Sequence, residues 1–250
     1  MFSDILNQLP TLLLALPAVL LSLSIHEAAH GLVANQLGDP TAKNMGRITL
    51  NPLKHLDPIG FIGMLFFRIG WANPVPVNTR YFKKPRRDMA LTAAAGPLSN
   101  LLLAIIFANL LRLVMIPIEP TIQEYWMTAD ESVLENGMFT FFSILATMLY
   151  LGIGLNINLM LFNLIPLPPL DGSRIAYIFL PTDLYFKIMQ YERYIMIGFI
   201  ILFATGILDT PLGLANTFIT GILYSILDMP IFEVFIAMGH VLSKLPTFSL

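Results

Sequence analysis

Residues 5–30 read ILNQLPTLLLALPAVLLSLSIHEAAH, an apolar run that ends in two histidines and a glutamate. The first 21 residues of this run carry no formal charge. About 20 apolar residues are enough for a helix to cross the hydrocarbon core of a bilayer, so the run predicts a membrane-spanning helix. No basic residue precedes it, since the first Lys or Arg is Lys43, and no convincing cleavage site follows. We therefore expect a retained helix and not a signal peptide.

The composition of the whole chain also indicates a membrane protein. Hydrophobic residues make up 56% of the 250 residues, and the charged types only 12%, about half of the ~25% usual in globular proteins. This composition excludes a disordered chain, and the net charge of −2 argues against a nucleic-acid partner. The absence of cysteine excludes disulfides and thiolate metal ligands. We expect an all-α, polytopic bundle of transmembrane helices.

Further apolar runs predict about five spans in total, with six as the competing count. The runs after the first are 89–111, 136–170, 189–208 and 210–227, and 230–243 either continues the last one or forms a separate helix. The stretch 58–67 is too short to cross, so we expect a re-entrant or extended segment near residues 51–80. Residues 1–250 are expected to form one integral-membrane domain, with its core at about 10–180 and additional C-terminal spans at 189–243.

The distribution of basic residues predicts how the helices are oriented. Nine of the 14 Lys and Arg lie between the first two predicted spans: Lys43, Arg47, Lys54, Arg68, Arg80, Lys83, Lys84, Arg86 and Arg87. Loops rich in Lys and Arg stay in the cytoplasm, so we expect this loop inside and the N-terminus outside. The loop 118–136 has five acids and no base, and is expected outside. The segment 166–187 then returns to the cytoplasmic side of the cell membrane.

The end of the first run, residues 26–30, has the pattern His-Glu-x-x-His. Residues i and i+4 of a helix share a face, so His26 and His30 can reach one ion, and zinc accepts imidazole nitrogen. Glu27 lies beside them, where it could take a proton from metal-bound water. If the helix begins near Pro10, His26 lies ~24 Å along it, in the cytoplasmic leaflet. The alternative interpretation is a polar cap at the membrane interface.

A second motif, NLIPLPPLDG at residues 163–172, closes the longest apolar run. Its three prolines end the helix, and the irregular backbone beyond them must be satisfied by protein or water. Two histidines leave a zinc site one protein ligand short, and Asp171 is the best candidate, although it could instead cap the next helix. Asn163 could donate to a substrate carbonyl, or it could join helices, as we expect for Asn156 and Asn158.

These two motifs resemble those of the site-2 protease family of intramembrane zinc metalloproteases, in its compact prokaryotic branch without PDZ or CBS domains. The resemblance covers about residues 10–180. It implies that His26, His30 and Asp171 bind one Zn²⁺ per chain, that Glu27 is the catalytic base, and that Asn163 stabilises the substrate. Four other stretches also resemble this branch of the family. They are residues 51–53 together with His55, Asp57-Pro58 together with Gly60, residues 71–78, and Ala95-Gly96-Pro97 together with Asn100.

The sequence thus predicts a protease that hydrolyses peptide bonds of transmembrane or membrane-associated protein substrates within the lipid bilayer. Zinc-bound water would attack the scissile carbonyl, Glu27 would remove its proton, and zinc with Asn163 would stabilise the oxyanion. One alternative is a metal transporter, against which the lack of an internal repeat argues. Another is a non-catalytic membrane scaffold, which would normally have lost a ligand or the glutamate.

Several other polar residues leave two interpretations open. His55 and Asp57 could be hydrogen-bond partners of a ligating histidine, or could form an interfacial turn. Residues 72–78 could be an edge strand that receives an extended substrate, or a structural loop. The run 83–87 is expected to be a basic anchor that contacts anionic lipid. Asp228, Glu233 and His240 could line a water path or lie at solvated helix ends, and Gly96-Pro97 with Asn100 should allow helices to approach closely.

Overall fold

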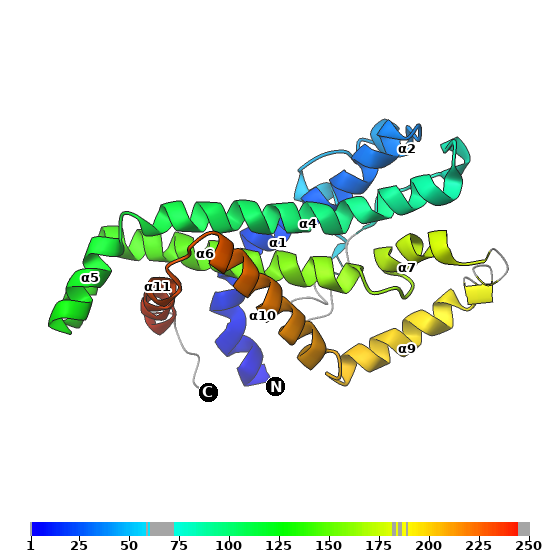
Figure 1. Cartoon of the computed structure of the whole chain (residues 1–250). Helices are drawn as coiled ribbons and strands as arrows, with labels where there is room; N and C mark the ends of the chain where they lie inside the picture. The colour runs from blue at the N-terminus through cyan, green and yellow to red at the C-terminus, as the bar shows by residue number, and fades with distance from the viewer. Residues whose placement is uncertain are drawn as a thin grey trace. The chain divides into compact units, whose positions relative to one another are not determined.

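A computed structural model describes residues 2–58, 60, 73–181, 184, 187, 188 and 190–244, without the side chains of residues 2–8, 204 and 232. Every regular element in these ranges is helical, which confirms the all-α expectation (Figure 1). The elements are α1 (Phe2–Gln36), α2 (Thr41–Asn44), η1 (Pro52–Lys54), η2 (Thr79–Tyr81), α4 (Pro85–Met115), α5 (Glu119–Thr128), η3 (Glu131–Leu134), α6 (Gly137–Asn163), α7 (Asp171–Ala176), η4 (Tyr177–Phe179), α9 (Glu192–Ala204), α10 (Asp209–Ile226) and α11 (Ile231–Lys244).

Three of the described helices are long and apolar enough to cross a membrane: Leu9–Gln36, Pro85–Met115 and Gly137–Asn163. They correspond to the first three predicted spans. The predicted spans 189–208 and 210–227 fall on α9, with 13 residues, and α10, with 18. The count of five or six spans therefore stays a prediction.

One helix boundary differs from the sequence expectation, and another agrees with it. Helix α1 begins at Phe2, with Pro10 and Pro17 inside it, whereas we expected it to begin near Pro10. Proline is tolerated inside membrane helices because neighbouring groups can satisfy the freed backbone carbonyls. The run 136–170 is helical only to Asn163, as its three prolines predict.

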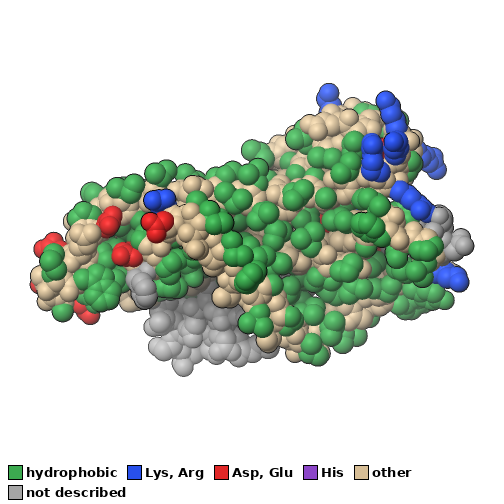
Figure 2. All heavy atoms as spheres, in the orientation of Figure 1, with side chains coloured by type: hydrophobic (Ala, Val, Ile, Leu, Met, Phe, Trp, Pro, Cys, Tyr) green, Lys and Arg blue, Asp and Glu red, His purple; other side chains and the backbone are tan. Residues whose placement is uncertain are grey.

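The surface of the long helices is strongly apolar. On α4 alone, Leu91, Leu98, Leu102, Ile105, Ile106, Leu110 and Leu113 are exposed. Hydrophobic side chains dominate the face of the molecule that Figure 2 shows. Exposed apolar surface of this extent is costly in water but favourable against lipid, so the chain is a membrane protein.

The chain divides into two compact units, and the three long helices contribute to both. Unit 1 comprises Met1–Leu20, Leu103–Leu155 and Thr220–Leu250. Within it, Gly152 of α6 lets Phe107 of α4 approach closely, because a Cβ at Gly152 would lie 2.6 Å from the Phe107 ring. His240 of α11 is 9% exposed and forms a 3.2 Å hydrogen bond with Thr140, so the expectation of a solvated helix end is wrong for His240.

Unit 2 comprises Leu21–Leu102 and Asn156–Ile219 and contains both sequence motifs. Buried polar side chains join its helices: the amide of Asn156 on α6 donates to Ser22 on α1 at 2.8 Å, and Asn100 on α4 donates to Asn156 at 2.8 Å. Asn156 thus joins helices as expected. Asn158 is exposed and accepts a 2.8 Å hydrogen bond from Asn216 of α10. In Figure 2, Lys and Arg side chains gather around α2 and the start of α4.

Candidate metal centre

The two histidines lie one turn apart on α1, inside the continuous helix that the sequence predicts. His26 is 6% exposed and His30 is 8% exposed. Both are therefore removed from solvent, and each must find partners for its two ring nitrogens within the protein.

Asp171 opens α7, directly after the proline-rich segment that follows α6. This segment packs on the start of α7, because a Cβ at Gly172 would lie 2.4 Å from the carbonyl oxygens of Leu164 and Ile165. Glycine is thus required for the close approach. The residue that caps α7 is Leu170, and no side-chain hydrogen bond caps this helix. The interpretation of Asp171 as a helix cap is therefore wrong, and its carboxylate is available for another partner.

The side chains of His26, His30 and Asp171 converge on one point. Asp171 Oδ2 lies 3.1 Å from Nε2 of His26 and 3.3 Å from Nε2 of His30, and the two Nε2 atoms lie 3.1 Å apart. A tetrahedral zinc ion with bonds of ~2.0–2.1 Å has ligand atoms about 3.3 Å apart. The triangle of donor atoms therefore has the size that one such ion requires, and these residues could hold a metal ion.

The hydrogen-bond partners of the two Nδ1 atoms determine whether the converging Nε2 atoms carry a proton or a lone pair. His26 Nδ1 donates to Asn100 Oδ1 at 2.5 Å, and His30 Nδ1 donates to the backbone carbonyl of Thr92 at 2.7 Å. In a neutral imidazole with Nδ1 protonated, Nε2 carries a lone pair. Asp171 Oδ2 is buried and has no hydrogen-bond partner among the described residues. Three electron-pair donors thus face one another, an arrangement that a cation stabilises.

Gly96 on α4 faces both imidazoles. A Cβ at this position would lie 2.5 Å from Cε1 of His26 and 2.5 Å from Cε1 of His30. The backbone of α4 therefore forms one wall of the site. This confirms that Gly96 allows α4 to approach α1 closely, and the two imidazoles lie at the point of approach.

Glu27 is half-buried, and its carboxylate is bound by the loop that precedes α4. Its Oε2 accepts a 2.8 Å hydrogen bond from the backbone N–H of Val75. Pro74 and Pro76 flank Val75 and have no N–H, so Val75 carries the one backbone donor of this tripeptide.

Two side chains hold the loop that carries Val75. Asp39, fully buried, accepts a hydrogen bond from the N–H of Asn78 at 2.6 Å, and Arg47 donates to the carbonyl of Asn73 at 2.6 Å. Both residues lie outside the two motifs, and no sequence signal indicated their contacts with this loop. Since these contacts occupy backbone groups at both ends of residues 73–78, they favour a structural loop over an edge strand for substrate. Residues 59 and 61–72 of the predicted re-entrant segment lie outside the described residues.

Asn163, the last residue of α6, is half-buried and donates to the carbonyl of Leu159 at 3.0 Å. His55 Nε2 donates to the carbonyl of Thr49 at 2.8 Å, and Asp57 accepts from the N–H of Gly60 at 2.8 Å. The Nδ1 partners of the two ligand candidates are Asn100 and Thr92, so His55 and Asp57 do not fill that role. The turn interpretation holds for both.

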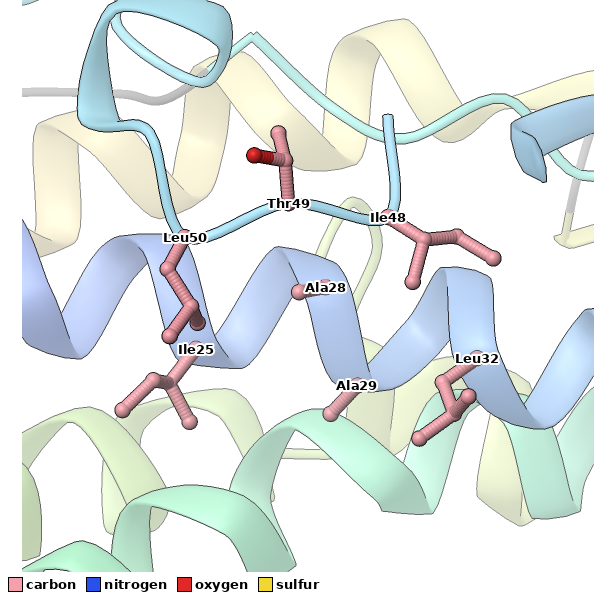
Figure 3. A pocket seen from close by; sticks show the side chains of 7 residues that line it. All are labelled: Ile25, Ala28, Ala29, Leu32, Ile48, Thr49 and Leu50. Atoms are coloured by element: carbon pink, nitrogen blue, oxygen red, sulfur yellow. The ribbon is translucent and has the colours of Figure 1, made fainter. Parts of the chain in front are cut away.

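An apolar pocket of about 300 Å³ lies against α1 (Figure 3). Ile25, Ala28, Ala29 and Leu32 line it from α1, together with Ile48, Thr49 and Leu50. With 3.6 residues per turn, these four α1 residues lie on a different face of the helix from His26 and His30. The pocket contains no titratable side chain and is separate from the metal centre.

The chain is similar in sequence to a known protein family and to several individual proteins. The model of peptidase family M50 matches residues 14–205. A Bacillus subtilis protein named "Putative zinc metalloprotease YwhC" is 45% identical over 83% of this chain and 84% of its own length. Rip2 of Mycolicibacterium smegmatis, which carries the same designation, is 28% identical over 67% of this chain, and the match spans 57% of Rip2. No solved structure matches the chain.

Proposed function

This chain belongs to peptidase family M50, and we propose that, as an intramembrane zinc metalloprotease, it uses His26, His30 and Asp171 to hold one zinc ion. The convergence of three buried electron-pair donors carries this proposal. When bound, zinc polarises a carbonyl group and activates water at neutral pH. Membership in a peptidase family favours proteolysis over the alternatives of a metal transporter or a non-catalytic scaffold.

Glu27 is the general base of the proposed reaction. It is adjacent in sequence to His26 but is not part of the donor triangle, so its carboxylate is available to take a proton. The N–H of Val75 restrains Oε2, which leaves Oε1 as the atom that receives the proton from the attacking water. A general base must be within hydrogen-bond reach of that proton, and the hydrogen bond from Val75 fixes the position of the carboxylate.

Asn163 is the proposed donor to the substrate carbonyl. An asparagine amide has two N–H groups, and the contact with Leu159 uses one of them. The second can stabilise negative charge that develops on the carbonyl oxygen. The position of Asn163 at the end of α6, eight residues before Asp171, supports this role.

The substrate we propose is a transmembrane or membrane-associated protein. His26 and His30 lie within the span Leu9–Gln36, so a peptide must enter the membrane region to reach them. The nine basic residues between the first two spans support a cytoplasmic loop, an external N-terminus and a site in the cytoplasmic leaflet.

Metal analysis of the purified full chain in detergent tests the site. We expect close to one zinc per chain in the wild type and loss of that zinc in the His26→Ala, His30→Ala double variant, because it removes two of three ligands. Asp171→Asn should lower zinc affinity together with cleavage, since a neutral amide is a poorer ligand. Undiminished zinc in the double variant would rule out this site.

A further inference from the structure

A chain of buried hydrogen bonds runs from His26 away from the metal centre. His26 Nδ1 donates to Asn100 Oδ1 at 2.5 Å, Asn100 Nδ2 donates to Asn156 Oδ1 at 2.8 Å, and Asn156 Nδ2 donates to Ser22 Oγ at 2.8 Å. Ser22, Asn100 and Asn156 each have 0% exposure. These hydrogen bonds therefore connect three helices, α1, α4 and α6, without access to water.

The proton donors of this chain all point in one direction. The oxygen of Asn156 accepts from the amide of Asn100, and this contact turns the oxygen of Asn100 toward His26. An amide oxygen only accepts, so Nδ1 of His26 must carry the proton and Nε2 must carry the lone pair. With the opposite order of donors, Nε2 would be protonated and could not bind a metal ion.

The two histidines obtain this state in different ways. His30 donates to the carbonyl of Thr92, a backbone acceptor that no rotation can turn into a donor. His26 depends on an amide side chain, which has a donor and an acceptor end and needs its own partners to select one. The oxygen of Asn156 supplies that selection, because it accepts from the amide group of Asn100 and leaves the oxygen of Asn100 facing His26.

We propose that Asn100 is a positioning residue of the metal centre, and that Asn156 orients it so that His26 presents Nε2 to the metal. This inference rests on the proposed zinc site. Partners that accept the second N–H of a metal-binding histidine are worth 10–100-fold in metal affinity. Asn100 and Asn156 each form two inter-helix hydrogen bonds, so a role in helix packing alone predicts similar losses at both positions, whereas only Asn100 contacts His26.

The experiment measures zinc affinity of the full chain in detergent by competition with a chromophoric chelator, alongside thermal stability. Asn100→Leu should weaken zinc binding about 10–100-fold and alter the visible spectrum of the cobalt-substituted protein. Asn100→Asp should keep affinity near that of the wild type, because a carboxyl oxygen still accepts from His26. Asn156→Leu should weaken zinc binding less than Asn100→Leu does, although each variant removes two inter-helix hydrogen bonds. Asn158→Leu, on the exposed face of the same helix, is the matched control and should bind as the wild type does.

The inference is overturned if Asn100→Leu binds zinc as tightly as the wild type. It is also overturned if zinc affinity follows thermal stability across the set, with Asn156→Leu as weak as Asn100→Leu and no rescue by Asn100→Asp. If Asn100→Leu does not fold, the test compares the zinc affinity of Asn156→Leu with that of Asn158→Leu. Equal zinc affinity in these two variants refutes the inference. Failure of the wild type to bind zinc would instead refute the proposed function.

Discussion

Gly96→Ala is the substitution whose effect follows most directly from the geometry of the metal centre. The added methyl group would lie 2.5 Å from Cε1 of both imidazoles, whereas carbon atoms in contact stay about 3.5–4.0 Å apart. Both rings must therefore retreat by about 1 Å, or α4 must move away. Metal sites tolerate changes of only about 0.2 Å in ligand distance, so we expect zinc binding to be lost. The overpacking itself should cost about 1–3 kcal/mol of stability, which leaves room for a folded protein.

The matched control for this experiment is Gly154→Ala. Gly154 also lies within a long apolar helix, but a Cβ there would meet nothing within 4 Å. Alanine should stabilise that helix by about 0.5–1 kcal/mol and leave zinc unchanged. Zinc content and thermal unfolding of both variants in detergent provide the measurement. A folded Gly96→Ala protein with one tightly bound zinc would show that α4 does not wall the site as described.

Two further predictions concern the catalytic base and the membrane orientation. Val75→Pro removes the N–H that binds Glu27, and a proline between Pro74 and Pro76 suits an extended loop. A hydrogen bond to a charged group is worth about 1.5–3 kcal/mol, so cleavage should fall about 10–100-fold while zinc content is unchanged. Equal cleavage by Val75→Pro and Val77→Pro would refute a role for this N–H. Reporters fused after Lys84 should read cytoplasmic and reporters at 119–135 external, and the reverse result would contradict the orientation drawn from the basic residues.

Sequence alone was sufficient to predict that His26, His30 and Asp171 lie together. His26 and His30 could be paired because helical periodicity places residues i and i+4 on one face, and the prolines before Asp171 indicated an irregular segment that could bring a carboxylate to them. The helices themselves follow from the length and apolarity of their runs. These signals are local, so they survive without knowledge of how the helices cross.

The surroundings of the donor set could not be predicted in the same way. The motif containing Asn100 was visible, but the atom it contacts depends on how α4 crosses α1. The carbonyl of Thr92 has no sequence signal, because every residue carries one. The contacts of Asp39 and Arg47 with the loop before α4 depend on long-range closure of the chain. Sequence reasoning therefore identified the three residues that cluster and missed the groups that hold them.

Glu27→Gln tests most directly whether this chain is a metalloprotease with the proposed chemistry. Glutamine keeps the size and shape of glutamate but cannot take the proton, and residue 27 is not part of the donor triangle. In the purified full chain, cleavage of a single-span peptide that the wild type hydrolyses should fall roughly 10²–10⁴-fold, while zinc content and thermal stability stay at wild-type values. Cleavage by Glu27→Gln at near the wild-type rate, with zinc bound, would contradict the mechanism.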